Sequence, residues 1–187
     1  MKKILILNRG EIALRIIRTC LDLNINHLLV YSKEDSSSLP VKLAQETFCL
    51  GEGPSSNTYL NQELILEVAF LTNCDSIHPG YGFLSENASF AQKCKDNNII
   101  FIGPNIQSLK IMGDKLKSKK FAIEHHIPVL QSLDVNQFDH HSLQKASLEL
   151  GFPLLIKASG GGGGKGMQKI EHEDELFPVI EKLKKNH

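Results

Sequence analysis

The chain has 187 residues, of which 41% are hydrophobic and 22% are charged, and 21 basic residues balance 21 acidic ones. This length suits one domain, or one domain and part of a second, and allows roughly 70% of the unfolded surface to be buried. A net charge of zero gives no electrostatic footprint for nucleic acid or an anionic membrane, and the absence of Trp leaves few platforms for stacking bases. The composition predicts a globular protein that binds neither.

The cysteines and the amino-terminal sequence indicate in which cellular compartment the protein is expected. Four widely spaced cysteines form no CxxC pair, so we expect free, buried thiols rather than a zinc or redox site; they are Cys20, Cys49, Cys74 and Cys94. The apolar run after Lys3 ends at Asn8, which is too short for a secretion signal, and no apolar stretch reaches the ~20 residues that a membrane span needs. We therefore expect a cytoplasmic protein.

Short apolar runs alternate with amphipathic segments over the first hundred residues. This alternation predicts an α/β fold with a Rossmann-like, doubly wound parallel sheet. Strands are expected at 3–7, 27–32, 47–50, 76–78 and 99–103, and helices at 10–23, around 36–45 with a Ser cap, near 60–71 and at 84–96. The turn at 7–13 has a single glycine and no GxGxxG pattern, so nothing in it indicates NAD.

The pattern changes after Gly103-Pro104. Helices are expected at 105–112, 115–125, 140–151 and 174–185, an extended segment at 127–132, and strands at 152–159 and 166–170. We predict three parts, namely an N-terminal domain at 1–103, a helical connector at 104–127 and a smaller unit with a glycine-rich flap at 128–187.

Five consecutive glycines, Gly160–Gly164, lie within ASGGGGGKGMQ at 158–168. Ordering each glycine costs roughly 0.5–1 kcal/mol relative to Ala. A Walker A loop fails at both ends, because Ser159 stands at its first position and Gly166 follows Lys165. A GxGxxG motif can be forced onto this run, but it should open a helix, and here a strand follows.

A glycine loop between two strands can instead close its backbone amides over phosphates. Lys157 supports this interpretation, because its ammonium lies between apolar runs and must reach solvent or an anion. Each charge-assisted hydrogen bond contributes roughly 1.5–3 kcal/mol, so a few would offset the glycine entropy. We expect a flap that is mobile when empty and ordered around nucleotide. A flexible linker remains the alternative.

Several strings resemble biotin carboxylase, the ATP-grasp component of acetyl-CoA, propionyl-CoA, methylcrotonoyl-CoA and pyruvate carboxylases. They follow one another along nearly the whole chain: KILILNRGEIALRIIRT (3–19), YLN (59–61), SIHPGYGFLSENASFA (76–91), FIGP (101–104), MGDK (112–115) and GFPLLIKASGGGGGKGM (151–167). The resemblance implies a pre-ATP-grasp domain followed by an incomplete ATP-grasp lid. The family uses MgATP to activate bicarbonate as carboxyphosphate and then carboxylates N1 of carrier-bound biotin.

The resemblance also assigns residues and partners. Lys115 and Lys157 would contact the ATP phosphates, Met167 would lie near the adenine, Tyr81 would face the biotin side and Arg18 would lie at a homodimer interface. The flap residues on the nucleotide would be Gly162, Gly163, Gly164, Lys165 and Gly166. A biotin carrier protein and a carboxyltransferase would be partners, and in a eukaryote the mitochondrial matrix is an alternative location. From the residues alone, a solvated residue at the start of a helix remains the alternative for Lys115, and a packed turn residue the alternative for Tyr81. We expect His78 to be structural.

The family's adenine-binding hinge strand, two metal-binding acids, bicarbonate-binding arginine and general base lie beyond the part that this chain resembles. We therefore predict no catalytic residue and no metal ligand here. Five acids are expected to be solvated, namely Glu171, Glu173, Asp174, Glu175 and Glu181, and no metal site is expected at the two adjacent His pairs. The chain alone should be inactive. The alternative is a non-catalytic remnant or interaction module that docks on a separately encoded remainder, whereas HPGYGFLSEN argues against another ATP-grasp ligase.

Overall fold

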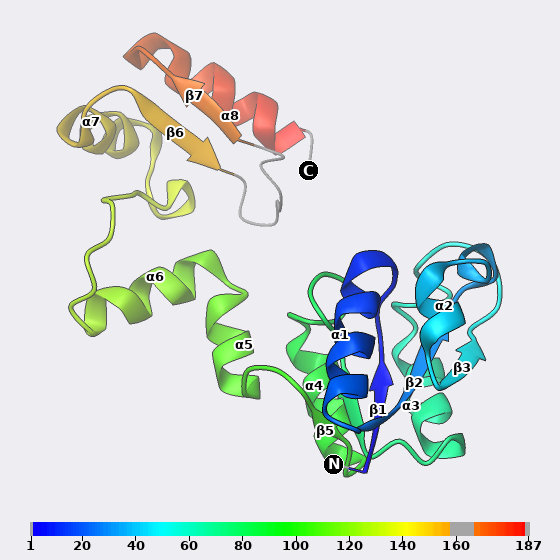
Figure 1. Cartoon of the computed structure of the whole chain (residues 1–187). Helices are drawn as coiled ribbons and strands as arrows, with labels where there is room; N and C mark the ends of the chain where they lie inside the picture. The colour runs from blue at the N-terminus through cyan, green and yellow to red at the C-terminus, as the bar shows by residue number, and fades with distance from the viewer. Residues whose placement is uncertain (1, 158–166, 186–187) are drawn as a thin grey trace. The chain divides into compact units, whose positions relative to one another are not determined.

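The computed structural model describes residues 2–157 and 167–185, apart from the side chains of Lys115, Lys184 and Lys185 (Figure 1). Its contacts divide the chain into two compact units, Met1–Ser118 and Lys119–His187. We call them unit 1 and unit 2 and describe each by itself. The division falls inside the connector predicted at 104–127, and the predicted domain limits stay a prediction.

Unit 1 contains a five-stranded parallel sheet in the order β3-β2-β1-β4-β5. The strands are β1 (Lys3–Ile6), β2 (Asn26–Tyr31), β3 (Glu46–Cys49), β4 (Ser76–His78) and β5 (Ile100–Phe101). In the central pairs, Ile6 lies opposite Leu29 of β2 and His78 of β4. The parallel sheet predicted from the alternation is confirmed, although β5 is shorter than the strand predicted at 99–103.

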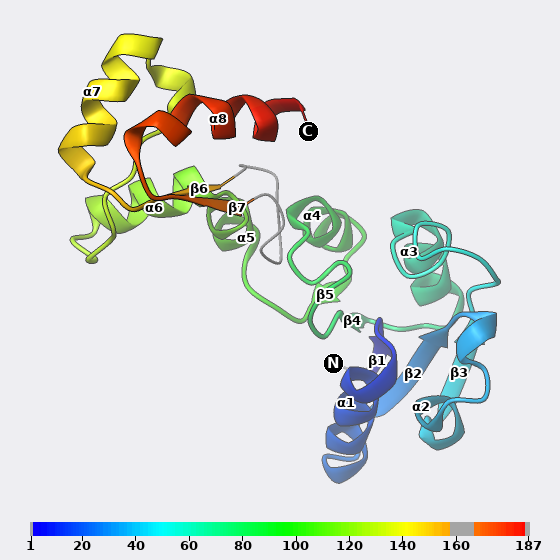
Figure 2. The same cartoon turned by 90° about the horizontal axis from the view of Figure 1, so that it is seen from above.

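Helices cover both faces of this sheet, with α1 and α2 on one side and α3 and α4 on the other (Figure 2). Unit 1 contains α1 (Gly10–Asp22), the 3-10 turn η1 (Lys33–Asp35), α2 (Leu39–Leu43), α3 (Gln62–Leu71), α4 (Ala88–Asp96) and α5 (Ile106–Met112), and α6 (Lys115–Glu124) crosses the division. Successive side chains of β1 point to opposite faces of the sheet. Leu5 packs with α3 and α4, whereas Ile4 and Ile6 pack with α1. A sheet buried on both faces explains the continuous apolar strands.

Asparagine caps decide where three of the helices begin. The backbone N–H groups of Leu64, Phe90 and Ser108 donate to the side chains of Asn61, Asn87 and Asn105, respectively, at 2.8 to 3.2 Å. The helix predicted at 84–96 therefore starts only at Ala88, after the Asn87 cap. The predicted Ser cap of α2 is wrong in detail, because the Ser38 side chain makes no capping hydrogen bond.

One further prediction needs correction. Cys49 is exposed on the edge strand β3, whereas the other three cysteines are buried, and all four are free. Leu21 of α1 is 44% exposed. Residues 127–132, predicted to be extended, have no regular secondary structure, and their extended conformation stays a prediction.

Unit 2 is built on an antiparallel pair of strands, β6 and β7, with α7 and α8 packed against one face (Figure 2). Its elements after α6 are the 3-10 turn η2 (Val135–Gln137), α7 (His140–Leu150), β6 (Leu154–Lys157), β7 (Met167–Ile170), the 3-10 turn η3 (Glu173–Glu175) and α8 (Leu176–Lys185). The core joins Leu143 of α7 and Ile170 of β7 to α8. Among the described residues, no helix is long and apolar enough to cross a bilayer.

We expect Phe90→Ala to destabilise unit 1 by about 3–5 kcal/mol, because the ring is fully buried and packs edge-on against Phe101 with ring centroids 6.1 Å apart. Urea unfolding followed by tyrosine fluorescence measures this. The probe is specific, since all three tyrosines lie in unit 1 and the sequence has no Trp. The control Phe70→Ala, at a side chain that is 82% exposed, should change stability by less than about 0.5 kcal/mol. Equal effects would contradict the assigned core.

Candidate functional site

The antiparallel pairing of β6 and β7 brings together the two ends of the glycine-rich segment. Lys157, the last residue of β6, lies opposite Met167, the first residue of β7. The predicted arrangement of strand, glycine segment and strand is therefore confirmed at its two flanking strands. The predicted flap residues themselves, Gly162, Gly163, Gly164, Lys165 and Gly166, lie outside the described residues.

One face of this hairpin is open. Its side chains come from Leu155, Lys157, Met167 and Lys169, all of them exposed, whereas Ile156 and Ile170 point into the core of unit 2. Leu155 is 53% and Met167 45% exposed. An apolar surface beside two lysines, next to a glycine-rich segment, can accept a flat apolar group that carries phosphates.

The two lysines of this face are not equivalent. The ammonium of Lys169 forms an ion pair with Glu171 at 2.7 Å, which partly neutralises it. Within the described part of the chain, no ion pair is recorded for Lys157. Lys157 is therefore the stronger candidate for an anionic ligand. Lys115 begins α6 in unit 1, and its side chain is outside the description.

In unit 1 the carboxyl ends of β1 and β4 meet at the point where the strand order reverses, which is where open α/β sheets commonly bind ligands. Here the side chain of Asn8, only 1% exposed, fills this position. Its amide donates to the carbonyl oxygens of Pro79 at 2.7 Å and Tyr81 at 2.9 Å. The crevice therefore holds the chain's own loop.

Tyr81 lies on this loop with an exposed ring. It is 63% exposed, and its hydroxyl donates to Glu11 of α1 at 2.7 Å. This hydrogen bond raises the pKa of Tyr81. The ring is thus held at its hydroxyl and is otherwise largely open to solvent.

A polar cluster lies beside this loop. Arg9 donates through Nε and Nη2 to both oxygens of Asp35, with Nε to Oδ2 at 2.6 Å. The Tyr59 hydroxyl donates to Asp35 at 2.7 Å and accepts from the backbone N–H of Ser32 at 3.0 Å. The hydrogen bond from Arg9 lowers the pKa of Asp35, and burial raises the pKa of Tyr59 to about 12. Both groups keep their charge states at neutral pH, as a structural cluster requires.

His78 is structural, as expected. Its Nδ1 accepts the backbone N–H of Gly80 at 3.0 Å, and burial lowers the pKa of its imidazole. Among the described residues, no group of three or more His, Cys, Asp or Glu side chains is placed to hold a metal ion. His125 stacks on Phe121 and His140 on Phe177.

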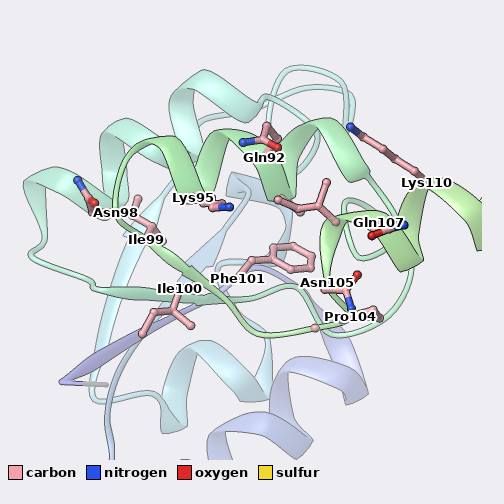
Figure 3. A pocket seen from close by; sticks show the side chains of 13 residues that line it. Gln92, Lys95, Asn98, Ile99, Ile100, Phe101, Pro104, Asn105, Gln107 and Lys110 are labelled. Carbon is pink, nitrogen blue, oxygen red and sulfur yellow. The ribbon is translucent and has the colours of Figure 1, made fainter.

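A surface groove of about 910 Å³ lies along β5, between α4 and α5 (Figure 3). Phe101 forms its apolar base, and Lys95 and Lys110 stand among its polar lining residues. The lining contains no carboxylate, imidazole or thiol. It therefore offers none of the usual metal-ligating side chains, and its titratable lining groups are the ammonium groups of Lys95 and Lys110. Arg18, the predicted dimer residue, is exposed on α1.

A family model described as "Biotin carboxylase, N-terminal domain" matches residues 1–109. The chain belongs to the biotin carboxylase family. A second model, "Carbamoyl-phosphate synthase L chain, ATP binding domain", matches residues 114–186 and covers the hairpin. The resemblance stated from the sequence is confirmed.

Individual relatives support the membership of this family. Pyruvate carboxylase of Staphylococcus aureus is 45% identical over 185 residues, which cover 98% of this chain and 16% of that protein. Biotin carboxylase 2 of Bacillus subtilis is 43% identical over 183 residues, which cover 98% of this chain and 41% of the relative. The chain thus spans about two fifths or less of the length of these relatives.

Solved structures confirm the fold. The Campylobacter jejuni biotin carboxylase, described as a beta-gamma-ATP complex, matches with a TM-score of 0.91 and 40% identity, over 97% of this chain and 41% of that one. The biotin carboxylase domain dimer of Hydrogenobacter thermophilus 2-oxoglutarate carboxylase, in complex with MgADP, ADP and bicarbonate, matches with a TM-score of 0.89 and 40% identity, over 97% and 40% of the two chains.

The sequence interpretation missed Asn8, Glu11 and the cluster around Asp35. A signal existed for Asn8, because a polar residue directly after a buried strand lies at the carboxyl edge of the sheet. No sequence signal pointed to Asp35 and Tyr59, since their contact joins residues that are 24 positions apart in sequence.

Acidification should weaken unit 1 through His78. Because its folded pKa is lowered, the unfolded chain, with a pKa near ~6.5, binds the proton more tightly, so the free energy of unfolding falls as the pH drops below about 6.5. In His78→Asn, the amide oxygen can still accept the Gly80 N–H without titrating. Urea unfolding from pH 8 to pH 5 should give a shallower pH dependence for this variant than for the wild type, whose other histidines are the same. Superimposable pH dependences would contradict the role of His78.

Proposed function

We propose that this chain forms the amino-terminal part of a biotin carboxylase, which uses MgATP and bicarbonate to carboxylate carrier-bound biotin. The observation that carries the proposal is the β6–β7 hairpin, whose paired ends Lys157 and Met167 flank the glycine-rich segment. Membership of the family and the match of an ATP-binding domain over 114–186 support it.

The hairpin is proposed to cover the nucleotide. Lys157 would contact the phosphates, because its ammonium is exposed beside the glycine-rich segment. Met167, together with Leu155, offers an apolar surface to the adenine. Backbone amides of the flap would bind phosphate oxygens, through Gly162, Gly163, Gly164, Lys165 and Gly166, and Lys115 would add a second phosphate contact.

Tyr81 is proposed to face biotin, and Arg18 to lie in a homodimer interface. The exposed ring of Tyr81 and the exposed position of Arg18 on α1 support these assignments. A biotin carrier protein would deliver the substrate, and a carboxyltransferase would use the product. That second enzyme determines whether an acyl-CoA, such as acetyl-CoA for fatty acid synthesis, or pyruvate is finally carboxylated.

The proposed reaction has two steps. Bicarbonate attacks the γ-phosphorus of ATP to give carboxyphosphate and ADP, and the carboxyl group then passes to N1 of biotin with release of phosphate. The charge on the transferred phosphoryl group needs cations, and Lys157 would supply one. Mg²⁺ does not fit the described residues alone, because they offer no cluster of acidic ligands, so we derive no step through it.

The remaining assignments follow the family interpretation. We propose an N-terminal domain at 1–103, a connector at 104–127 and part of the ATP-grasp lid at 128–187. We also propose that the enzyme acts in the cytoplasm or, in a eukaryote, in the mitochondrial matrix.

Lys157→Ala should weaken ATP binding by the 187-residue chain about 10- to 100-fold, the equivalent of one charge-assisted hydrogen bond. Lys169→Ala is the matched control, because it removes a lysine from the same face whose ammonium already pairs with Glu171. Isothermal titration with ATP, with and without Mg²⁺, measures both. Equal losses, or wild-type protein without affinity for ATP, would contradict the role of the hairpin.

The 187-residue chain alone should show no biotin- and bicarbonate-dependent ATP cleavage, because its described residues hold no group of three or more acidic, His or Cys side chains placed to bind a metal ion. Adding a separately expressed polypeptide that corresponds to the rest of a full-length relative should produce this activity. Turnover by the chain alone would overturn the predicted incompleteness. Binding of that polypeptide without turnover would favour the non-catalytic interaction module.

A further inference from the structure

Two segments far apart in sequence meet where β1 and β4 end. The first, which we call the 8–11 turn, contains Asn8, Arg9, Gly10 and Glu11 and leads from β1 into α1. The second, the 79–83 loop, contains Pro79 to Phe83 and follows β4. Three sets of side-chain contacts, which we call routes, connect the turn to the loop, and each reaches the loop at or near Tyr81.

The first route is the buried amide of Asn8. Its nitrogen donates to the carbonyl oxygens of Pro79 and Tyr81, and its oxygen accepts the backbone N–H of Arg9. Both hydrogens and the oxygen of the amide are therefore in use, which fixes the orientation of the side chain. The two carbonyls lie on either side of Gly80, so the amide holds the loop at its bend.

Gly80 shows how closely the loop lies against the turn. Its φ is +65°, and a Cβ atom there would lie 2.6 Å from Cγ2 of Ile12 and 2.8 Å from Nδ2 of Asn8. A side chain added here would force the loop, or the Asn8 and Ile12 side chains that it meets, to shift. The close approach thus requires glycine both for its conformation and for its size.

The second route is direct, from Glu11 to the Tyr81 hydroxyl at 2.7 Å. The third passes through the polar cluster. Arg9 holds Asp35, Asp35 holds the hydroxyl of Tyr59, and the ring of Tyr59 stacks on Phe83 with centroids 4.9 Å apart and 14° between the planes. Phe83 has a φ of +41°, which is unfavourable for a residue with a side chain, so this stacking supports the end of the loop.

We propose that the 8–11 turn is the positioning element for Tyr81, with Asn8 holding the backbone of the 79–83 loop and Glu11 holding the phenol. This inference rests on the proposed function, in which the Tyr81 ring faces biotin. Asn8 and Glu11 are positioning residues, because they act through Tyr81 and not on the reacting atoms.

The phenol of Tyr81 can report the position of the loop, because the hydrogen bond to Glu11 raises its pKa above the ordinary value of about 10. We would label the 187-residue chain with 13Cζ-tyrosine and follow its three tyrosine signals by NMR from pH 7 to pH 12. Tyr81→Phe assigns the signal.

In Asn8→Ala, the Tyr81 signal should titrate near the ordinary value, although Asn8 does not touch the hydroxyl. Gly80→Ala should have the same effect, because the added Cβ clashes with the Asn8 amide that holds the loop. Glu11→Gln should lower the pKa of Tyr81 but leave the backbone amide signals of Gly80 and Gly82 in place. The control Asn105→Ala removes a helix cap on α5 and should leave Tyr81 unchanged.

An unchanged Tyr81 titration in Glu11→Gln, or in folded Asn8→Ala or Gly80→Ala, would overturn the proposal. If Asn8→Ala and Gly80→Ala do not fold, the Glu11 variant still decides the second route. Titration with free biotin tests the proposed function separately. A biotin-induced shift of the wild-type Tyr81 signal that weakens several-fold in Asn8→Ala supports both. If biotin leaves the signal unmoved, the role in carboxylation fails while the geometry is still tested by the phenol.

Discussion

The fold of unit 1 depends on how the crevice between β1 and β4 is filled. A parallel sheet whose strand order reverses at this point leaves a gap between adjacent carboxyl ends. The Asn8 amide fills that gap and donates to two carbonyls of the 79–83 loop. A buried carbonyl oxygen without a hydrogen-bond partner would cost about 1–3 kcal/mol of folding free energy. The Asn8 side chain provides a donor for two such oxygens at once. The position where a dinucleotide would bind in a Rossmann enzyme is thereby used to hold a loop.

Among its described residues, unit 2 has only a two-stranded sheet, which must be stabilised by packing against helices. Two strands alone are only marginally stable in water, so one face must pack against helices. Leu143 of α7 and Leu176 of α8 provide this packing, together with Ile170 of β7. The other face is then left open, with Leu155, Lys157, Met167 and Lys169 exposed. The same alternation of side chains that builds the core therefore produces the face to which we assign the nucleotide.

The elements of the fold could be predicted where periodicity was strong. The helices α1 and α3 and the strands β1 and β2 agree with the sequence within two residues. The start of α4 could not be predicted from periodicity, because the Asn87 cap and the turns before Asn87 determine where this helix begins. The strand order was also beyond local patterns, since it depends on which helix covers which face.

The site was predictable to the extent that its residues follow one another along the chain. Lys157 and Met167 flank the glycines in sequence, so the hairpin follows from two apolar runs. The contacts of Asn8 with Pro79 and Tyr81 span 71 and 73 residues, and no spacing rule reaches that far. Only the type and place of Asn8, a polar residue closing a buried strand, pointed to it.

Charge decides between the lysines of the hairpin in the end. Lys157 and Lys169 share one face, yet Glu171 already compensates Lys169 at 2.7 Å. A polyphosphate approaching Lys169 would have to compete with this carboxylate and would be repelled by it. At Lys157, within the described residues, no such carboxylate is paired, and the residue also joins the glycine-rich segment directly. In the proposed complex an anion would therefore be drawn toward the glycine-rich segment, so that its binding offsets the backbone entropy cost of ordering the glycines.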